Sequence, residues 1–492
     1  MAYNLARNSR VFVTTNVNTA TGAVLTTGLT TLNTWEIQVL DGFKFAQNTN
    51  TQNIQINEAG NTPIRGQQAF NTALNPVDIT FSTYIRPYSN ANASAVTAEE
   101  RTLWNALLGY VGIEGTTQAG SVVSATTLGG TPSTLTRAAT DSPRVTFTGS
   151  TLNTSFTVNG TYNISGLTGS SAAAFNTPVK IVSSAAGALV VDYLTAPMGG
   201  GTAPITNVTA TAAVKFTQSA WQENAAGAGT YAFCSSAHSN KNQLQPIGFI
   251  FVVDNAAYTI DNCAMDQAQI DFSLDGIATV AWTAKGTKLN QLTAAPTMSA
   301  ATDPVFSGSI TGTAKGKNVN AGYINNKLST TTLTSNIDGI SGTAYSVVLT
   351  GGSISIANNI NYVTPANIGT VNVPIGYFTG TRAVSGSLNA YLRTGASGTP
   401  WDTSTLLKDL LASTNASSTK FNLQVEVGGA SNTTKIELDM TGCMIGIPTV
   451  DIADVVSTTI SFTAQGTNAT TTGNTYDIEN TNDIMIRYYS AV

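Results

Sequence analysis

Polar and apolar residues alternate along several short stretches, which is the pattern of a strand with one buried face and one exposed face. The clearest example runs from residue 267 to residue 275. Its polar members are Gln267, Gln269, Asp271, Ser273 and Asp275, and its apolar members are Ala268, Ile270, Phe272 and Leu274. Thr and Val are frequent, and turn-forming Gly and Asn recur at short intervals. We therefore expect a mainly β protein.

The chain contains an internal repeat. Residues 263–287 (CAMDQAQIDFSLDGIATVAWTAKGT) align without a gap with residues 443–467 (CMIGIPTVDIADVVSTTISFTAQGT), so that Asp271 meets Asp451 and Trp282 meets Phe462. Earlier segments match in the same order, namely 54–56 with 354–356 and 81–86 with 388–393. The chain is therefore expected to be a tandem pair of one β-rich unit.

Each unit is predicted to carry one helix. The apolar positions Leu103, Trp104, Leu107 and Leu108 have the spacing of one helix face, and Leu406, Leu407, Leu410 and Leu411 repeat it. Thr97 and Glu100 form a potential capping box before the first helix, and Asp402 or Thr403 is the expected cap of the second. Because only one strip of each helix is apolar, each helix should lie against a sheet.

Two segments interrupt the repeat. Residues 118–213 are rich in Gly, Ser, Thr and Ala and have no counterpart in the second half, which predicts a small β domain inserted into a loop of the first unit. Residues 293–304 have the composition of a linker. The expected division is therefore 1–117 with 214–292 for the first unit, 118–213 for the insertion, 293–304 for the linker and 305–492 for the second unit.

The composition narrows the function classes. Charged residues make up 10% of the chain, well below the roughly 25% of ordinary soluble domains. The hydrophobic share of 42% is enough for a buried core. A net charge of −5 argues against a nucleic-acid binder, which would need a basic stripe. A weakly charged surface also opposes self-association only weakly, as suits a protein that assembles.

Candidate catalytic chemistry is scarce. The cysteines Cys234, Cys263 and Cys443 are odd in number and match no zinc spacing, so reduced thiols are expected. His238 is the only histidine, which leaves little for a metal site or a Ser-His-Asp triad. We expect no catalytic residue, no metal site and no cofactor. Residues 1–13 lack the apolar region of a signal peptide, so synthesis and assembly in a cytoplasm are expected.

Several segments resemble the large major tail tube proteins of long-tailed siphophages, in which two tube domains are fused in one chain. These segments cover most of the chain outside the insertion and occur in the same order as in that family. None of them alone is highly specific for the family, but together they are. In the first half they are 5–14 (LARNSRVFVT), 56–60 (INEAG), 63–66 (PIRG), 81–88 (FSTYIRPY), 115–117 (GTT) and 260–263 (IDNC). In the second half they are 323–328 (YINNKL), 360–365 (INYVTP), 374–380 (PIGYFTG) and 386–392 (GSLNAYL).

The resemblance implies two tandem tube-type β-sandwich or barrel domains, each with one flanking helix. It also implies trimeric, pseudo-hexameric rings that stack into a tube in the phage tail, through which DNA passes without specific binding. The implied partners are other copies of the chain, a tape measure protein and tail terminal proteins. The insertion departs from the family pattern. We expect it to face outward, either without a partner or as a weak binder of cell-surface sugar.

Two groups of residues are candidates for sites. Gln267, Gln269, Asp271, Ser273, Asp275 and Asp451 would line the lumen, or they form an ordinary solvated outer face. Glu58 and Arg65 would form an ion pair in an inter-subunit loop, or they are two exposed charges worth about 0–1 kcal/mol. A tail fibre or surface adhesin that binds host glycans is the alternative function, and the sequence leaves open whether the tail contracts.

Overall fold

The structure is a computed structural model. It describes residues 9–18, 20–29, 33–40, 42–54, 68–89, 96–98, 100–108, 126–137, 144–154, 156, 161–176, 178–193, 205, 207–218, 221–223, 230–234, 244, 246–254, 256–273, 276–298, 323–335, 344–366, 368, 371–394, 403–412, 420–428, 434–452, 455–464 and 483–489. Strands dominate these ranges, which confirms a mainly β protein. The candidate residues Glu58, Arg65 and Asp275 lie outside them.

The first unit pairs its strands in two runs that share β17. One run is β2–β1–β16–β17–β19, and the other is β17–β18–β4–β3, with every pairing antiparallel. The strands are β1 (Ser9–Thr14), β2 (Thr34–Ile37), β3 (Lys44–Ile54), β4 (Gln68–Tyr84), β16 (Ile247–Val253), β17 (Ala256–Ser273), β18 (Thr279–Gly286) and β19 (Lys288–Leu292).

The second unit repeats this topology. Its runs are β21–β20–β26–β27–β30 and β27–β29–β25–β22, with β28 continuing the edge after β27. The strands are β20 (Thr330–Ser335), β21 (Ala344–Val347), β22 (Leu349–Ala357), β25 (Ala383–Tyr391), β26 (Lys420–Val427), β27 (Lys435–Ile445), β28 (Thr449–Asp451), β29 (Ser457–Ala464) and β30 (Met485–Tyr489). Each first-unit pairing thus has a counterpart in the second unit.

The strand registers correct two details of the sequence alignment. Asp271 pairs with Thr279, whereas Asp451 pairs with Ser457, so the second hairpin is shorter and Trp282 corresponds to Ile460 rather than to Phe462. Register also matches Ile354 with Phe45 rather than with Ile54. The first of these corrections is a shift of two residues, which keeps every side chain on its own face, so the burial pattern alone does not reveal it.

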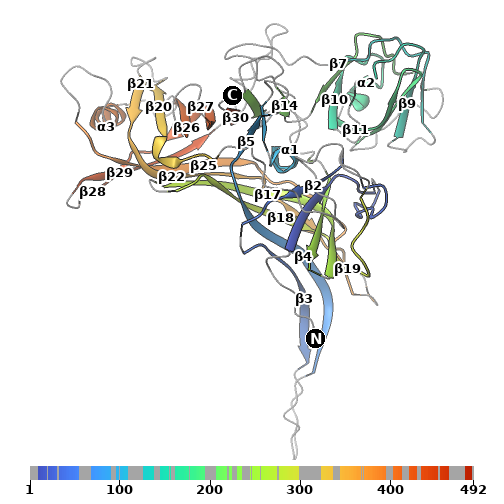
Figure 1. Ribbon diagram of the computed structural model, residues 1–492, viewed down its shortest axis with the longest axis horizontal. Helices are drawn as coiled ribbons and strands as arrows, with labels where there is room; N and C mark the ends of the chain where they lie inside the picture. Colours follow the sequence, from blue (N-terminus) through green and yellow to red (C-terminus); the bar gives the residue numbers. More distant parts are fainter. Residues whose placement is uncertain are drawn as a thin grey trace, which may run out of the picture.

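The inserted strands form a sheet of their own. Seven strands are ordered β7–β13–β10–β11–β12–β9–β8, and their apolar side chains make a separate core cluster. They are β7 (Thr126–Thr127), β8 (Thr134–Thr136), β9 (Arg144–Thr148), β10 (Thr161–Ser165), β11 (Pro178–Ala185), β12 (Ala188–Tyr193) and β13 (Lys215–Gln218). The sheet carries the short helix α2 (Ala172–Phe175) (Figure 1). Because it includes β13, it extends past the expected boundary at residue 213.

The helices α1 (Arg101–Leu108) and α3 (Thr403–Ala412) occupy the expected places, and the buried side chains of both join one core that spans the two units. Trp104 of α1 meets Trp282 of β18 edge-on, with ring centroids 4.6 Å apart. The capping box is wrong, because Thr97 pairs with Tyr88 in a short strand. The backbone carbonyl of Glu100 instead accepts the amide of Leu103 at 2.9 Å.

Shorter elements complete the described chain. They are β5 (Pro87–Ser89), β6 (Val96–Ala98), β14 (Trp221–Glu223), β15 (Thr230–Cys234), β23 (Asn361–Val363), β24 (Gly376–Phe378) and one 3-10 turn (Asn326–Leu328). Strand β15 joins the first unit to β30 of the second. The start of the expected linker is packed rather than free, because Met298 is only 8% exposed and bridges to Leu29.

Candidate assembly surface

A single sheet surface runs across both units. Strands β3, β4, β18, β17, β22, β25, β29 and β28 are hydrogen-bonded in this order, and we call this set the platform (Figure 1). The join between the units is the β17–β22 pairing, which runs from Gln267 opposite Ala357 to Ser273 opposite Gly351. Within the described strands the platform is open at both ends, at β3 and at β28, and does not close into a barrel.

One face of the platform is apolar and buried. It carries Ile270 and Phe272 of β17, Ile354 and Ile356 of β22, and Trp282 of β18, each at most 4% exposed. Helix α1 packs on this face through Trp104, whose indole Nε1 donates to the Tyr488 hydroxyl at 2.8 Å. The opposite face is therefore the one that is available to solvent or to a bore.

The opposite face is made almost entirely of hydroxyl, amide and small side chains, and we call it the polar face. The registers place on it Lys44, Asp78, Thr80, Ser82, Tyr84, Thr279, Ala281, Thr283, Lys285, Gln267, Gln269, Asp271, Ser273, Ser353, Ser355, Ser385, Ser387, Asn389, Tyr391, Ser457, Thr459, Ser461, Thr463, Thr449 and Asp451. All of them are partly or fully exposed. Such a face offers hydrogen bonds but little net charge.

The structure brings the described lumen candidates together on this face. Gln267 Nε2 donates to Ser355 Oγ at 2.8 Å, and Gln269 Nε2 donates to Asp271 Oδ1 at 2.9 Å. Asp451 lies at the far edge, on β28, and is exposed. That these side chains line a lumen remains a prediction. Polar and apolar residues alternate in β25 and β29 as well. That alternation could have predicted the rest of the polar face from the sequence, but these strands were not among the sequence-based candidates.

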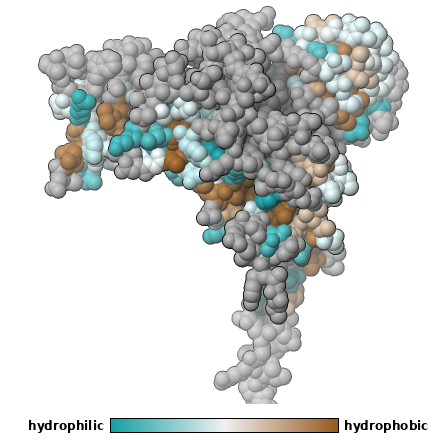
Figure 2. Space-filling model, in the orientation of Figure 1, coloured by the Kyte–Doolittle hydropathy of each residue, from teal (hydrophilic) through white to brown (hydrophobic). Residues whose placement is uncertain are grey.

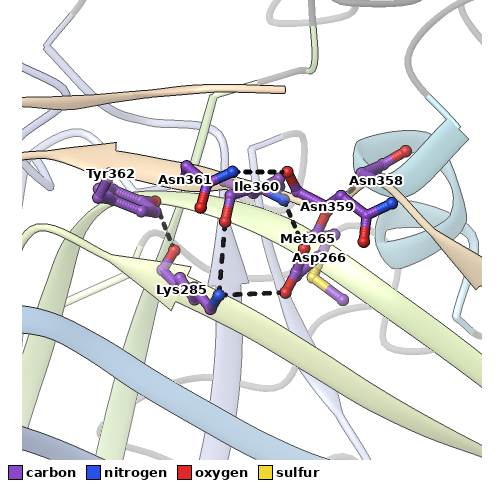
Figure 3. A network of polar contacts seen from close by, with 8 residues as sticks. All are labelled: Met265, Asp266, Lys285, Asn358, Asn359, Ile360, Asn361 and Tyr362. Carbon is purple, nitrogen blue, oxygen red and sulfur yellow. Dashed lines mark hydrogen bonds and ion pairs between the residues drawn. The ribbon is translucent and has the colours of Figure 1, made fainter. Parts of the chain in front are cut away.

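The joint between the units is held by a polar network beside the β17–β22 pairing (Figure 3). The Asp266 carboxylate accepts the Ile360 amide at 2.8 Å and lies 3.4 Å from Lys285 Nζ. Lys285 Nζ also donates to the Ile360 carbonyl at 3.4 Å, and the Tyr362 hydroxyl lies 2.7 Å from the Lys285 carbonyl. The first unit thereby holds the chain that follows β22.

A second set of contacts ties the same segment to α1. Asn358 Nδ2 donates to the Leu107 carbonyl at 2.7 Å, and Arg382 Nη2 donates to it at 3.1 Å. Arg382 Nε donates to Asn358 Oδ1 at 3.1 Å. Burial lowers the pKa of the Arg382 guanidinium, an effect opposed by the charge of Asp483. These bonds supply donors to a carbonyl group at the C-terminal end of α1. Residues of the second unit therefore cap the helix of the first unit.

The β28 end of the platform exposes apolar side chains that the repeat buries elsewhere. Val450 and Ile452 are 40% and 83% exposed, whereas the equivalent Ile270 and Phe272 are 0% and 4% exposed beneath the β17–β22 joint. Figure 2 shows exposed apolar residues at the left end of the platform, where β28 lies. The second unit therefore ends in a surface that, in the first unit, another unit covers.

Other kinds of site find little support in the described ranges. No group of three or more His, Cys, Asp or Glu side chains there could hold a metal ion. Cys263 and Cys443 are buried free thiols, and burial raises the pKa of both, that of Cys443 to about 12. Such thiols are poor nucleophiles, because the thiolate is the reactive form. None of the described helices has the length and apolar character needed to cross a membrane.

Comparison with known proteins identifies a relative that matches over most of the chain. No family model matches the chain. The chain is similar to the tail tube protein pb6 of Escherichia phage T5, with 25% identity over 466 residues. The matched region covers 94% of this chain and 73% of the phage protein, so it includes both units and the joint between them.

Proposed function

This chain belongs to the major tail tube proteins of siphophages, and on that basis we propose that its copies assemble into stacked trimeric rings whose bore conducts DNA. Its place in the virion is the tail. The trimer follows the family resemblance, in which the two units of each chain make the ring pseudo-hexameric. Assembly in the host cytoplasm, and partners such as the tape measure and tail terminal proteins, belong to the same proposal.

The observation that carries the ring proposal is the β17–β22 pairing. It joins β17, at one edge of the sheet in the first unit, to β22, at the opposite edge of the equivalent sheet in the second unit. The contact is therefore head-to-tail. A head-to-tail contact that repeats forms a ring when its rotation closes after a whole number of copies, and an open filament when it does not. Closure also removes open strand edges, which otherwise invite uncontrolled pairing. Fusing the two units in one chain reduces the number of association events needed to build a ring. Each such event costs about 4–15 kcal/mol in lost translational and rotational freedom.

The polar face suits the wall of a DNA channel. Cationic side chains hold DNA through release of phosphate counterions, so a lysine-rich wall would slow its passage. Lys285, on this face, already has the Asp266 carboxylate beside it. We place Gln267, Gln269, Asp271, Ser273 and Asp451 on the bore in this proposal. The protein would act structurally, not as an enzyme, and would contact DNA without specific binding.

Electron microscopy of the purified protein tests the proposal. We expect hollow tubes or rings in negative stain at high protein concentration. Isolated elongated trimers that bind host cells would instead favour a tail fibre or glycan-binding adhesin and would contradict a tube subunit. The two outcomes differ in shape and in cell binding, so a single preparation distinguishes them.

The inserted sheet is proposed to face the outside of the tube. Its separate core makes residues 126–218 a natural unit to remove. Replacing them with a short Gly-Ser linker should leave tube assembly intact, as an outward domain would, and negative stain should show a thinner wall. Loss of tubes in a variant that keeps its circular dichroism would contradict an outward position. Loss of host adsorption alone would identify the insertion as a cell-surface binder.

A further inference from the structure

The two open edges of the platform have counterparts that pair with each other inside the chain. Strand β3 occupies in the first unit the place that β22 occupies in the second, because each pairs with the corresponding neighbour, β4 or β25. Strand β28 occupies the place of the second half of β17, because each pairs with the corresponding hairpin strand, β29 or β18. The pairing of β17 with β22 is therefore a template for pairing β28 with β3.

We propose that β28 of one copy pairs antiparallel with β3 of the next copy, in a register that sets Asp451 opposite Lys44. This inference rests on the ring proposed above and names the partner of each open edge, which is the other edge on a second copy. Among the described strands, β3 pairs with β4 alone and β28 with β29 alone, so each has a free side for this contact.

The register follows from matching positions. In the chain, Asp271 stands opposite Ser353. Asp451 takes the place of Asp271, because Asp271 pairs with Thr279 and Asp451 with Ser457 at the start of corresponding strands. Thr279 pairs in turn with Tyr84, and Ser457 pairs with Tyr391. Tyr84 of β4 and Tyr391 of β25 are therefore equivalent positions.

The same steps place Lys44. Counting four residues back from Tyr84 and Tyr391 gives Thr80 and Ser387, and these pair with Lys44 and Ser353 respectively. Lys44 therefore takes the place of Ser353. The pair Asp271–Ser353 within a chain becomes Asp451–Lys44 between chains.

Apolar side chains match in this register. Val450 would lie level with Phe45, and Ile452 level with Phe43, all on the buried side of the sheet. Phe43 and Phe45 are only partly buried, and both pack against Phe251 with ring centroids 5.9 and 4.6 Å away. The new contact would cover Val450 and Ile452, as the joint within the chain covers Ile270 and Phe272.

The charges make the pairing selective. Lys44 and Asp451 are both exposed in the single chain. Opposite charges that face each other across two strands stabilise the pair, and like charges destabilise it. Antiparallel pairing of two β28 edges or two β3 edges would bring like charges together, whereas the head-to-tail contact brings opposite ones together. A slip of one residue would also turn the polar face inward, which the buried apolar side opposes.

A charge swap tests the joint. The single variants Lys44→Glu and Asp451→Lys should each raise the protein concentration needed for tube assembly by at least about tenfold, because like charges would then face each other. The double variant Lys44→Glu/Asp451→Lys should return it to within about threefold of the unmodified protein. Asp271→Lys is the matched control, since Ser353 stands opposite Asp271, and it should leave assembly unchanged.

A disulfide tests the register independently of charge. Directly opposed positions in an antiparallel pair have Cβ atoms about 4.5–5.5 Å apart, close to disulfide range. Oxidised tubes of Lys44→Cys/Asp451→Cys should give covalently linked chains on a non-reducing gel. The pair Lys44→Cys/Thr449→Cys, out of register by two residues, should give few. Single-cysteine variants set the background, and the native Cys263 and Cys443 are buried.

The outcomes separate this joint from the function on which it rests. Tubes that form normally with both single charge variants and without the Lys44–Asp451 cross-link would overturn the joint while leaving the tube subunit in place. Failure of the unmodified protein to form rings or tubes would overturn both. Rescue by the double charge variant together with the in-register cross-link would establish the joint.

Discussion

The two repeated units share their strand topology but differ in what covers their edges. In the first unit, the second half of β17 is paired with β22 and its apolar residues Ile270 and Phe272 are buried. In the second unit, the equivalent Val450 on β28 and Ile452, directly after it, are exposed. Because the folds are alike, the difference must reflect the missing neighbour. A single chain thus contains both a completed joint and the two halves of an uncompleted one.

The units also differ in the chemistry of their joints. Asp266 and Lys285 form a charged network that holds the chain after β22, whereas Gly446 stands at the position equivalent to Asp266. A Cβ added at Gly446 would meet no atom within 4 Å. The permanent joint is therefore reinforced by side chains that the open edge lacks, and the open edge depends on apolar cover and the proposed Lys44–Asp451 pair.

The largest expected change in the free energy of unfolding distinguishes the helix of the first unit from that of the second. Trp104→Ala should lower the free energy of unfolding by about 3–5 kcal/mol, because it empties a buried site against Trp282 and removes the bond from the indole to the Tyr488 hydroxyl. Its counterpart Leu407 is only partly buried, so Leu407→Ala should cost about 1 kcal/mol. Urea unfolding followed by circular dichroism checks both. Equal losses would mean that the two helices are packed alike.

An intermediate effect is expected at the joint within the chain. Asp266→Ala should destabilise by about 1–3 kcal/mol, because the buried Ile360 amide loses its acceptor. Gly446→Asp should stay within about 0.5 kcal/mol, since the site is open. The midpoint of thermal unfolding of each variant, against the unmodified protein, measures the difference. A larger loss from Gly446→Asp would show that the equivalence of these positions is mistaken.

The smallest effect concerns the cysteines that the repeat brings into register. Burial raises the pKa of the Cys443 thiol from 9.0 to about 12, so the native state keeps a proton that the unfolded state releases. The resulting stability is fully present below pH 9 and falls as the pH rises toward 12. At pH 9 the loss from this group is about 0.4 kcal/mol. The fall between pH 7 and pH 9 should therefore be smaller in Cys443→Ala, and an unchanged slope would contradict a protonated native thiol.

Much of this architecture could be predicted from the sequence, for identifiable reasons. The alternation from Gln267 to Ser273 specifies a strand with a polar face, and the structure has β17 there. The apolar spacing around Leu103 and Leu406 specifies the two helices. These signals are local, because burial of one face imposes a period on the residues of a single element.

The rest depended on contacts between distant segments. The pairing of β17 with β22 joins strands far apart in the chain, and no local pattern encodes it. The alternation of apolar and polar residues could not reveal the two-residue shift of β29, since such a shift preserves which residues face the core. Thr97 suited a helix cap, but pairing with Tyr88 took it into a strand. No local pattern distinguishes Lys44 from other exposed lysines, because its equivalence to Ser353 follows only from the strand registers.

A cryo-electron microscopy reconstruction of assembled tubes tests the central claim most directly. We predict rings in which β28 of each copy pairs with β3 of the next, with Asp271 and Asp451 on the wall of the bore. A map that places the polar face on the outer surface, or that leaves β3 and β28 without a neighbouring strand, would contradict the account.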